Sequence, residues 1–307
     1  MRLLRSEFLR ARSRRLVPMV LVAGLLAVLI GLGIAAFNAN QPSAAAVAQA
    51  KVEYDATVAK CEHQFGRSGV PLDAPYSDVQ GFCEHYWSSP PIDGFLLRDL
   101  DSILQGIAMF VILLGVLLGA SLGGADWTNN TMQTLLTWEP RRTRVYLTRG
   151  LVIAVCVFVI TAFLQVVFAG VDVLVAATRG STGFLPSDFW RSVALTIGRT
   201  SLVASAFGVI AYAIAMIGRS TVSAVGALIG YLILFEAVIA GFRPSIQGNL
   251  LVRSAIVIIT HQAIFSDSGR GQVDVLLAVH RAWFVVAVYT LVIGAGALLV
   301  FRRRDVT

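Results

Sequence analysis

The chain has 307 residues, of which 56% are hydrophobic and 14% are charged, and its mean hydropathy is +0.74. A soluble domain carries about 25% charged residues, so this composition excludes an ordinary cytosolic enzyme. The net charge is +7, but the basic residues lie beside long apolar runs, where they orient a membrane protein rather than bind nucleic acid. Lys51 and Lys60 each follow an alanine, so neither lysine can belong to a Walker A phosphate-binding loop, which needs a glycine before its lysine.

Six apolar stretches reach or approach the roughly 20 residues that a helix needs to cross a bilayer core of about 30 Å. Backbone polar groups in lipid must be paired within their own segment, so each stretch predicts a helix. The predicted spans cover about 16–37, 103–123, 151–177, 193–217, 222–240 and 282–301. The predicted fold is therefore an all-α integral membrane protein whose six-span domain occupies residues 16–301.

The distribution of arginines predicts the orientation of the chain. With six spans, both termini share one side, together with the loops that follow the second and fourth spans. That side contains most of the arginines, including Arg302–Arg304, whereas the largest loop on the opposite side is net acidic. The positive-inside rule then places both termini, and the tail 302–307, in the cytoplasm. We expect a multi-pass protein of the plasma membrane, in a bacterium.

The first fifteen residues predict an interfacial helix. Leu4, Phe8 and Ala11 share one helical face, and arginines on the remaining faces can reach anionic headgroups. The alternative is a plain basic flank that only sets the topology. A cleaved secretory signal is a further alternative, but the apolar run that follows is longer than the usual signal core of roughly 7–15 residues.

The apolar segment 250–265 is interrupted by Arg253, Thr260, His261 and Gln262. Counting it as a seventh span would move Arg302–Arg304 to the outside, against the charge rule. We therefore expect a short interfacial or re-entrant helix packed against protein, where such a backbone is tolerated.

Residues 38–100 form an outer loop of about 60 residues, too few for an independent core unless it is stapled. Ala44 to Lys60 is rich in helix formers, and Gly66 to Pro91 has the Gly, Pro, Ser and Asp content of a loop. Cys61 and Cys83 offer a staple, since a disulfide is the usual state on an oxidising side and would contribute roughly 3 kcal/mol.

Two alternatives to this disulfide remain open for the same cysteines. The tripeptide Cys-Glu-His occurs twice, so Cys61, His63, Cys83 and His85 supply a Cys₂His₂ set suited to zinc. The other alternative is a pair of free thiols. We expect no other metal site in the chain.

The cytoplasmic loop 125–149 contains a short predicted helix with an apolar ridge. Three apolar residues at helical spacing and two flanking tryptophans form this ridge: Met132, Leu135, Leu136, Trp127 and Trp138. Pro140 ends the predicted helix, and an arginine cluster follows. Exposed apolar side chains are costly in water, so we expect the ridge to dock on a partner. The alternative is that the ridge packs on the ends of the chain's own helices.

This loop resembles the signature of the type-2 ATP-binding-cassette exporter permeases, which has an acidic residue, a Gly-Thr pair, a Leu-Leu pair, and then Pro and Arg. The matching residues are Asp126, Thr131, Leu135, Leu136, Pro140 and Arg144. Asn130 stands where the family usually has Gly, and Asn also tolerates a left-handed backbone. The segments Leu3–Phe8 and Phe301–Asp305 are similar to the family's amphipathic first segment and to the usual close of its sixth span.

The resemblance implies that two membrane subunits, as a homodimer or heterodimer, form a transport path while a separate ATPase subunit binds ATP and magnesium. This chain would then be no enzyme, would hold no cofactor and would contain no catalytic residue. The loop would contain the coupling helix, which sits in a cleft of the ATPase. The docking residues implied are Asp126, Trp127, Thr131, Met132, Leu135, Leu136, Trp138, Glu139, Pro140, Arg141, Arg142 and Arg144. Drugs, peptides, lipids and ions all remain open as substrates.

Three charged residues fall in or near the apolar runs, namely Asp172, Arg199 and Glu236. Such residues are costly in a membrane and often functional. One interpretation is an ion pair between Arg199 and a carboxylate that locks helices together. The other is a role in substrate passage or proton coupling, which supports an alternative function as an ion-gradient-driven transporter or channel. Glycines at small-xxx-small spacing predict close helix packing, namely Gly31, Gly33, Gly115, Gly119, Gly226 and Gly230.

Overall fold

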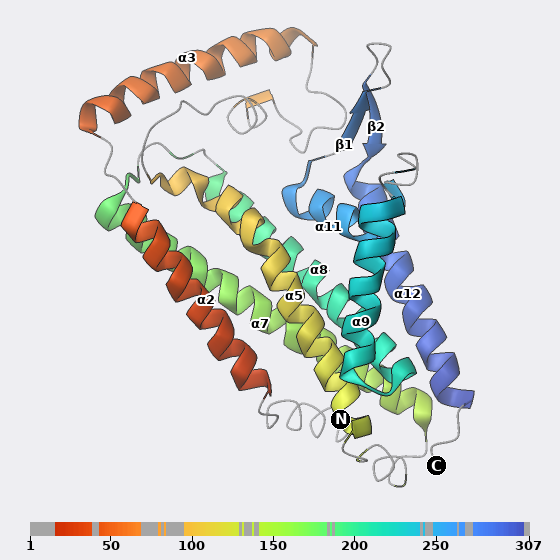
Figure 1. Ribbon diagram of the computed structural model, residues 1–307. Coiled ribbons are helices and arrows are strands. Elements are labelled where there is room, and N and C mark those ends of the chain that lie inside the picture. The colour runs from red at the N-terminus through yellow and green to blue at the C-terminus, as the bar shows by residue number, and fades with distance from the viewer. Residues whose placement is uncertain are drawn as a thin grey trace. The chain divides into compact units, whose positions relative to one another are not determined.

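The computed structural model describes residues 16–38, 43–68, 79–80, 83, 95–128, 131, 137, 141–182, 185, 188–239, 242, 248–262, 264–267 and 273–303. These residues form helices and one hairpin (Figure 1). The first elements are α2 (Leu16–Asn38), α3 (Ala44–Ser68), η1 (Leu97–Asp99), α5 (Leu100–Thr128), α7 (Arg142–Arg179) and α8 (Phe189–Gly218). They are followed by α9 (Thr221–Tyr231), the π-helix η2 (Leu232–Ile239), α11 (Leu251–Thr260), β1 (Ile264–Asp267), β2 (Val273–Leu277) and α12 (Val279–Arg303).

Four of the described helices are long enough and apolar enough to cross a membrane, so the chain is a helical membrane protein. They cover Leu97–Trp127, Arg142–Arg179, Phe189–Gly218 and Val279–Arg303. Helices α2 and α9 with η2 occupy the two remaining predicted ranges, and their apolar parts, Val17–Gly31 and Thr221–Glu236, are shorter. The count of six spans and the orientation therefore remain predictions.

The segment after residue 250 forms a short helix, as the interrupted apolar pattern predicted. Helix α11 has ten residues and so spans about 15 Å, half of a bilayer core. It packs against α12, and His261 ends it in the left-handed conformation, with φ 54°. The antiparallel hairpin of β1 and β2 follows. Within the described part of the chain, this hairpin differs from the all-α fold that the sequence predicted.

The described residues belong to two compact units. The first unit comprises those within 1–24, 107–164 and 198–307, and the second those within 25–106 and 165–197. Helices α5, α7 and α8 each contribute residues to both units.

In the first unit, glycines allow α5 and α8 to pack with their backbones in close approach. A Cβ atom on Gly115 would lie 2.8 Å from the carbonyl oxygen of Ala204, and one on Gly119 would overlap the backbone of Gly208. The predicted close packing is thus confirmed at these two glycines. At Gly226, a Cβ atom would meet no described residue within 4 Å, so the spacing alone did not identify a packed face there.

In the second unit, one face of α3 is buried. Ala50, Tyr54 and Cys61 are buried at helical spacing, and the guanidinium of Arg98 lies 4.6 Å from the centre of the Tyr54 ring. Cys61 forms a disulfide with Cys83. The predicted disulfide is therefore confirmed over the two alternatives, a zinc site and free thiols. Because both sulfurs are used in this bond, they cannot serve as thiolate ligands of zinc. His85 lies outside the described residues.

Candidate functional site

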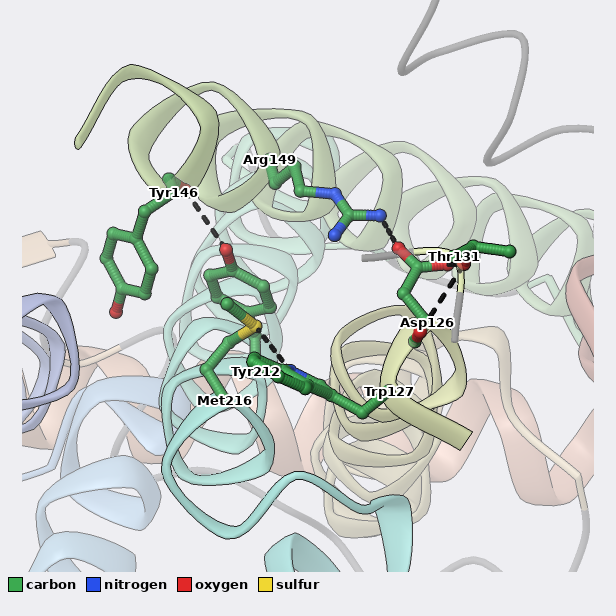
Figure 2. Close-up of polar contacts among 7 residues, drawn as sticks. All are labelled: Asp126, Trp127, Thr131, Tyr146, Arg149, Tyr212 and Met216. Atoms are coloured by element: carbon green, nitrogen blue, oxygen red, sulfur yellow. Dashed lines mark hydrogen bonds and ion pairs between the residues drawn. The ribbon is translucent and has the colours of Figure 1, made fainter. Parts of the chain in front are cut away.

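A buried ion pair joins the end of α5 to the beginning of α7. The carboxylate of Asp126 pairs with the guanidinium of Arg149, and both side chains are about 95% buried (Figure 2). The Thr131 hydroxyl donates a hydrogen bond to Asp126 Oδ1 at 3.1 Å. An acidic residue is unfavourable near a helix C-terminus, where the backbone carries partial negative charge, so Asp126 depends on the cation opposite it. The pair therefore ties together the two helices that flank residues 129–141.

The Trp127 side chain lies against three other elements of the same unit. Its indole N–H donates to the Met216 sulfur of α8 at 3.4 Å (Figure 2). The Arg219 guanidinium, in the turn between α8 and α9, lies 5.0 Å from the indole centre, and the Phe301 ring of α12 packs edge-on at 6.3 Å. Trp127 therefore connects the end of α5 to α8, to the following turn and to α12.

Two tyrosines fix the beginning of α7 to its neighbours. The fully buried Tyr212 of α8 donates its hydroxyl to the Tyr146 carbonyl oxygen at 3.1 Å (Figure 2), and the two rings lie 5.2 Å apart. The Tyr146 hydroxyl in turn donates to the Gly294 carbonyl oxygen of α12 at 3.0 Å. We call the residues Asp126, Trp127, Thr131, Tyr146, Arg149, Tyr212 and Met216 the α5–α7 anchor.

The structure shows intramolecular contacts for two of the predicted docking residues. Asp126 and Trp127 contact the chain's own helices. These contacts are of the kind that the alternative, packing on the ends of the chain's own helices, predicts. Their position is explained by their partners, a buried arginine and a methionine, which an outward-facing ridge would not have. They position the loop, and their contact with a partner stays a prediction.

Of the remaining predicted docking residues, Thr131 belongs to the anchor and the others divide into two groups. Arg141 and Arg144 are exposed, and the half-buried Arg142 reaches the carbonyl oxygen of Phe301 at 3.5 Å. The central part of the predicted ridge lies outside the described residues, namely Met132, Leu135, Leu136, Trp138, Glu139 and Pro140. Its docking role stays a prediction.

The sequence analysis did not identify Arg149, Tyr146, Tyr212 or Met216 as site residues. A signal for Arg149 was present, because it is a lone cation at the edge of an apolar run and therefore needs a partner or water. Nothing comparable in the sequence distinguishes Met216 from the other apolar residues of α8.

Of the three charged residues of the apolar runs, Asp172 lies in the second unit, and Arg199 and Glu236 lie in the first. Asp172 belongs to the second unit and is 2% exposed, and its Oδ2 has no hydrogen-bond partner among the described residues. Glu236 belongs to the first unit and accepts a hydrogen bond from the Val252 N–H at 2.7 Å. Among the described residues Glu236 is thus bonded to α11, and the interpretation of an ion pair between Arg199 and one of the carboxylates stays a prediction.

The positive charge of Arg199 affects a histidine at the end of α11. Burial lowers the pKa of His261, and the positive charge of Arg199 lowers it further. The Nδ1 atom of His261 is buried and has no hydrogen-bond partner among the described residues. The neutral imidazole is therefore the form that this environment favours.

Residues 73–307, well over half of the chain, match the protein family described as "Protein of unknown function (DUF2705)". No curated protein matches the sequence. The matched range includes every residue of the α5–α7 anchor.

Proposed function

The chain belongs to the DUF2705 family, and we propose that it is the membrane-spanning permease subunit of an ATP-binding-cassette exporter. The observation that carries the proposal is the α5–α7 anchor. It fixes both ends of residues 129–141, the segment in which the sequence resembles the coupling region of the type-2 exporter permeases. The segment therefore has the two properties of a coupling element, an apolar ridge in its sequence and firm attachment to membrane-spanning helices.

The anchor can transmit displacement because its contacts cross between helices. A force on residues 129–141 acts through Asp126 on α5 and through Arg149 on α7. Trp127 extends the same contact to α8 and α12. A partner can shift a conformational equilibrium only by interacting differently with its states, so this attachment is the physical requirement for ATP-driven movement of the spans.

In this proposal, the chain crosses the plasma membrane of a bacterium six times with both termini in the cytoplasm. It works with a second membrane subunit and with a separate ATPase that binds ATP and magnesium. The positive-inside distribution of arginines supports the orientation. The lysines support the division of labour, since neither has the preceding glycine that a Walker A loop requires.

Co-purification tests the proposal directly. A tagged full-length chain, extracted in mild detergent, is expected to bring down a subunit that hydrolyses ATP. The double variant Leu135→Asp/Leu136→Asp should lose that subunit while still inserting in the membrane. Val52→Asp is the matched control, because Val52 is 71% exposed on α3 and lies outside the loop. Absence of any ATPase from the wild-type preparation would refute the proposal.

A second candidate function is an ion-gradient-driven transporter or channel, and the buried carboxylate of Asp172 favours it. A carboxylate in an apolar helix, with one oxygen that has no partner among the described residues, is a candidate proton or cation carrier. This candidate predicts that Asp172→Asn abolishes transport and that depletion of ATP under a maintained ion gradient leaves transport unchanged. The exporter proposal predicts instead that depletion of ATP stops transport even when the ion gradient is maintained.

A further inference from the structure

Glu236 places a carboxyl group in the predicted fifth span. It lies in the π-helix η2 and is half-buried. Short π-helical turns within helices are frequent at functional sites, and an ionisable residue in a span is expected to have a functional partner. Among the described residues, Glu236 forms no ion pair with an arginine.

The two carboxylate oxygens of Glu236 differ in their contacts. Oε1 accepts hydrogen bonds from the Val252 N–H at 2.7 Å and from the Tyr231 hydroxyl at 3.4 Å. The Tyr231 hydroxyl itself accepts a bond from the Leu251 N–H at 2.9 Å, so it bridges Glu236 and the beginning of α11. Oε2 makes no hydrogen bond to the described residues. One oxygen thus holds α11, and the other is left for a further partner.

Three aromatic rings form a cluster that contacts this carboxylate through the Tyr231 hydroxyl. The rings of Tyr231 and Phe235 are stacked at 5.3 Å, and the rings of Tyr231 and Tyr289 meet edge to face at 6.1 Å. Hydrogen bonds hold both tyrosines, because Tyr289 donates to the Asn249 carbonyl oxygen at 3.4 Å. Phe235 is 44% exposed, so the cluster is open on the side of this ring.

We propose that Glu236, Tyr231, Phe235 and Tyr289 form a binding site for a lipophilic organic cation. Aromatic faces attract cations, and they do so more strongly when water is excluded. A carboxylate in a medium of low dielectric constant adds a strong Coulombic attraction and selects for positive charge. The site names the substrate class of the proposed exporter and in that respect rests on the proposed function.

The competing explanation is that Glu236 only caps α11. The variant Glu236→Gln separates the two roles, because the amide keeps an oxygen that can accept the Val252 N–H and loses the charge. Phe235→Leu removes an exposed ring without removing a hydrogen bond. Phe163→Leu is its matched control, since Phe163 is a 51% exposed phenylalanine of α7 that has no part in the cluster.

The experiment measures equilibrium binding of radiolabelled tetraphenylphosphonium to the purified full-length chain in lipid nanodiscs, without the ATPase. Tetraphenylborate, an anion of nearly the same size and shape, controls for apolar partition. The wild type should bind the cation saturably. Glu236→Gln should weaken this binding about tenfold and Phe235→Leu about threefold, while Phe163→Leu changes neither probe.

Wild-type affinity in Glu236→Gln, an equal loss for the cation and the anion, or no saturable cation binding to the wild type would each overturn the site. Because the measurement omits the ATPase, its result is independent of the co-purification. Failure of the cation site would leave the proposed exporter standing with another substrate. Cation binding by a chain that recruits no ATPase would support the site and refute the exporter.

Discussion

The α5–α7 anchor and the cluster around Glu236 each contain a carboxylate, but the two carboxylates have different kinds of partner. Asp126 is buried and its charge is neutralised by Arg149, in a region where Gly119 brings two helix backbones together. Glu236 is half-buried, is held by hydrogen bonds and has no arginine partner among the described residues. A carboxylate paired within the chain holds helices in place, whereas one without an arginine partner among the described residues is available to a ligand. The comparison therefore separates the region proposed for coupling from the region proposed for cation binding.

The largest expected effect comes from changing each carboxylate to its amide. Asp126→Asn leaves the Arg149 cation buried without a counterion, which should cost about 3–5 kcal/mol of folding stability. Glu236→Gln keeps an acceptor for the Val252 N–H and should cost less than about 1 kcal/mol. Thermal unfolding in detergent, followed by intrinsic fluorescence, compares the two. Equal losses would remove the distinction between the regions.

Adding a methyl group tests the difference in packing, with opposite signs expected. Gly119→Ala places a Cβ atom against the backbone of Gly208, whose Cα would lie 2.8 Å away, and should destabilise the protein by about 1–3 kcal/mol. Gly226→Ala meets no described residue within 4 Å and should stabilise α9 by roughly 0.5–1 kcal/mol. The same unfolding measurement reports both. Destabilisation by Gly226→Ala would mean that α9 is packed as closely as α5.

Removing one hydroxyl from each region gives a smaller effect. Tyr212→Phe deletes a fully buried hydrogen bond to the Tyr146 carbonyl oxygen and should cost about 1 kcal/mol. Tyr289→Phe deletes a longer bond at an exposed position, so its cost should be smaller. Both variants keep the aromatic ring, and cation binding should survive in Tyr289→Phe. Loss of cation binding in that variant would assign the site to the hydroxyl instead of the ring.

The smallest expected effect is the pH dependence due to His261. Its folded-state pKa is lowered by burial and by Arg199, so protonation is less favourable in the folded state than in the unfolded state. Its contribution to stability is therefore constant well above the ordinary histidine pKa of about 6.5 and falls as the pH drops through that value. His261→Asn should show a smaller fall in melting temperature between pH 7.5 and pH 5.5 than the wild type. An equal or greater fall in the variant would contradict this assignment.

The helices were predictable from the sequence to a greater extent than their contacts. Apolar runs locate α5, α7, α8 and α12 because the length of a span is set by the bilayer, whatever the neighbouring helices are. Helix α3 continues past the predicted end at Lys60 to Ser68, through Gly66, and there the Cys61–Cys83 disulfide joins residue 83 to the helix.

The candidate sites were less predictable because their partners are distant in the sequence. Asp126 looked like part of a surface motif, since nothing local indicates that Arg149 faces it across a helix pair. Glu236 looked like one of two possible partners for Arg199, whereas nothing local indicates that two backbone N–H groups at the beginning of α11 bond its carboxylate, one directly and one through Tyr231. Hydrophobic periodicity assigns residues to faces of helices but does not specify which faces meet.

Photo-crosslinking at position 137 tests the central claim most directly. Thr137 is exposed and lies within the segment that the α5–α7 anchor holds. A photoreactive amino acid at this position, in the full-length chain in native membranes, should form an adduct with an ATP-hydrolysing subunit on the cytoplasmic side. Adducts confined to the chain itself, or labelling of the position by a membrane-impermeant reagent from outside the cell, would contradict the account.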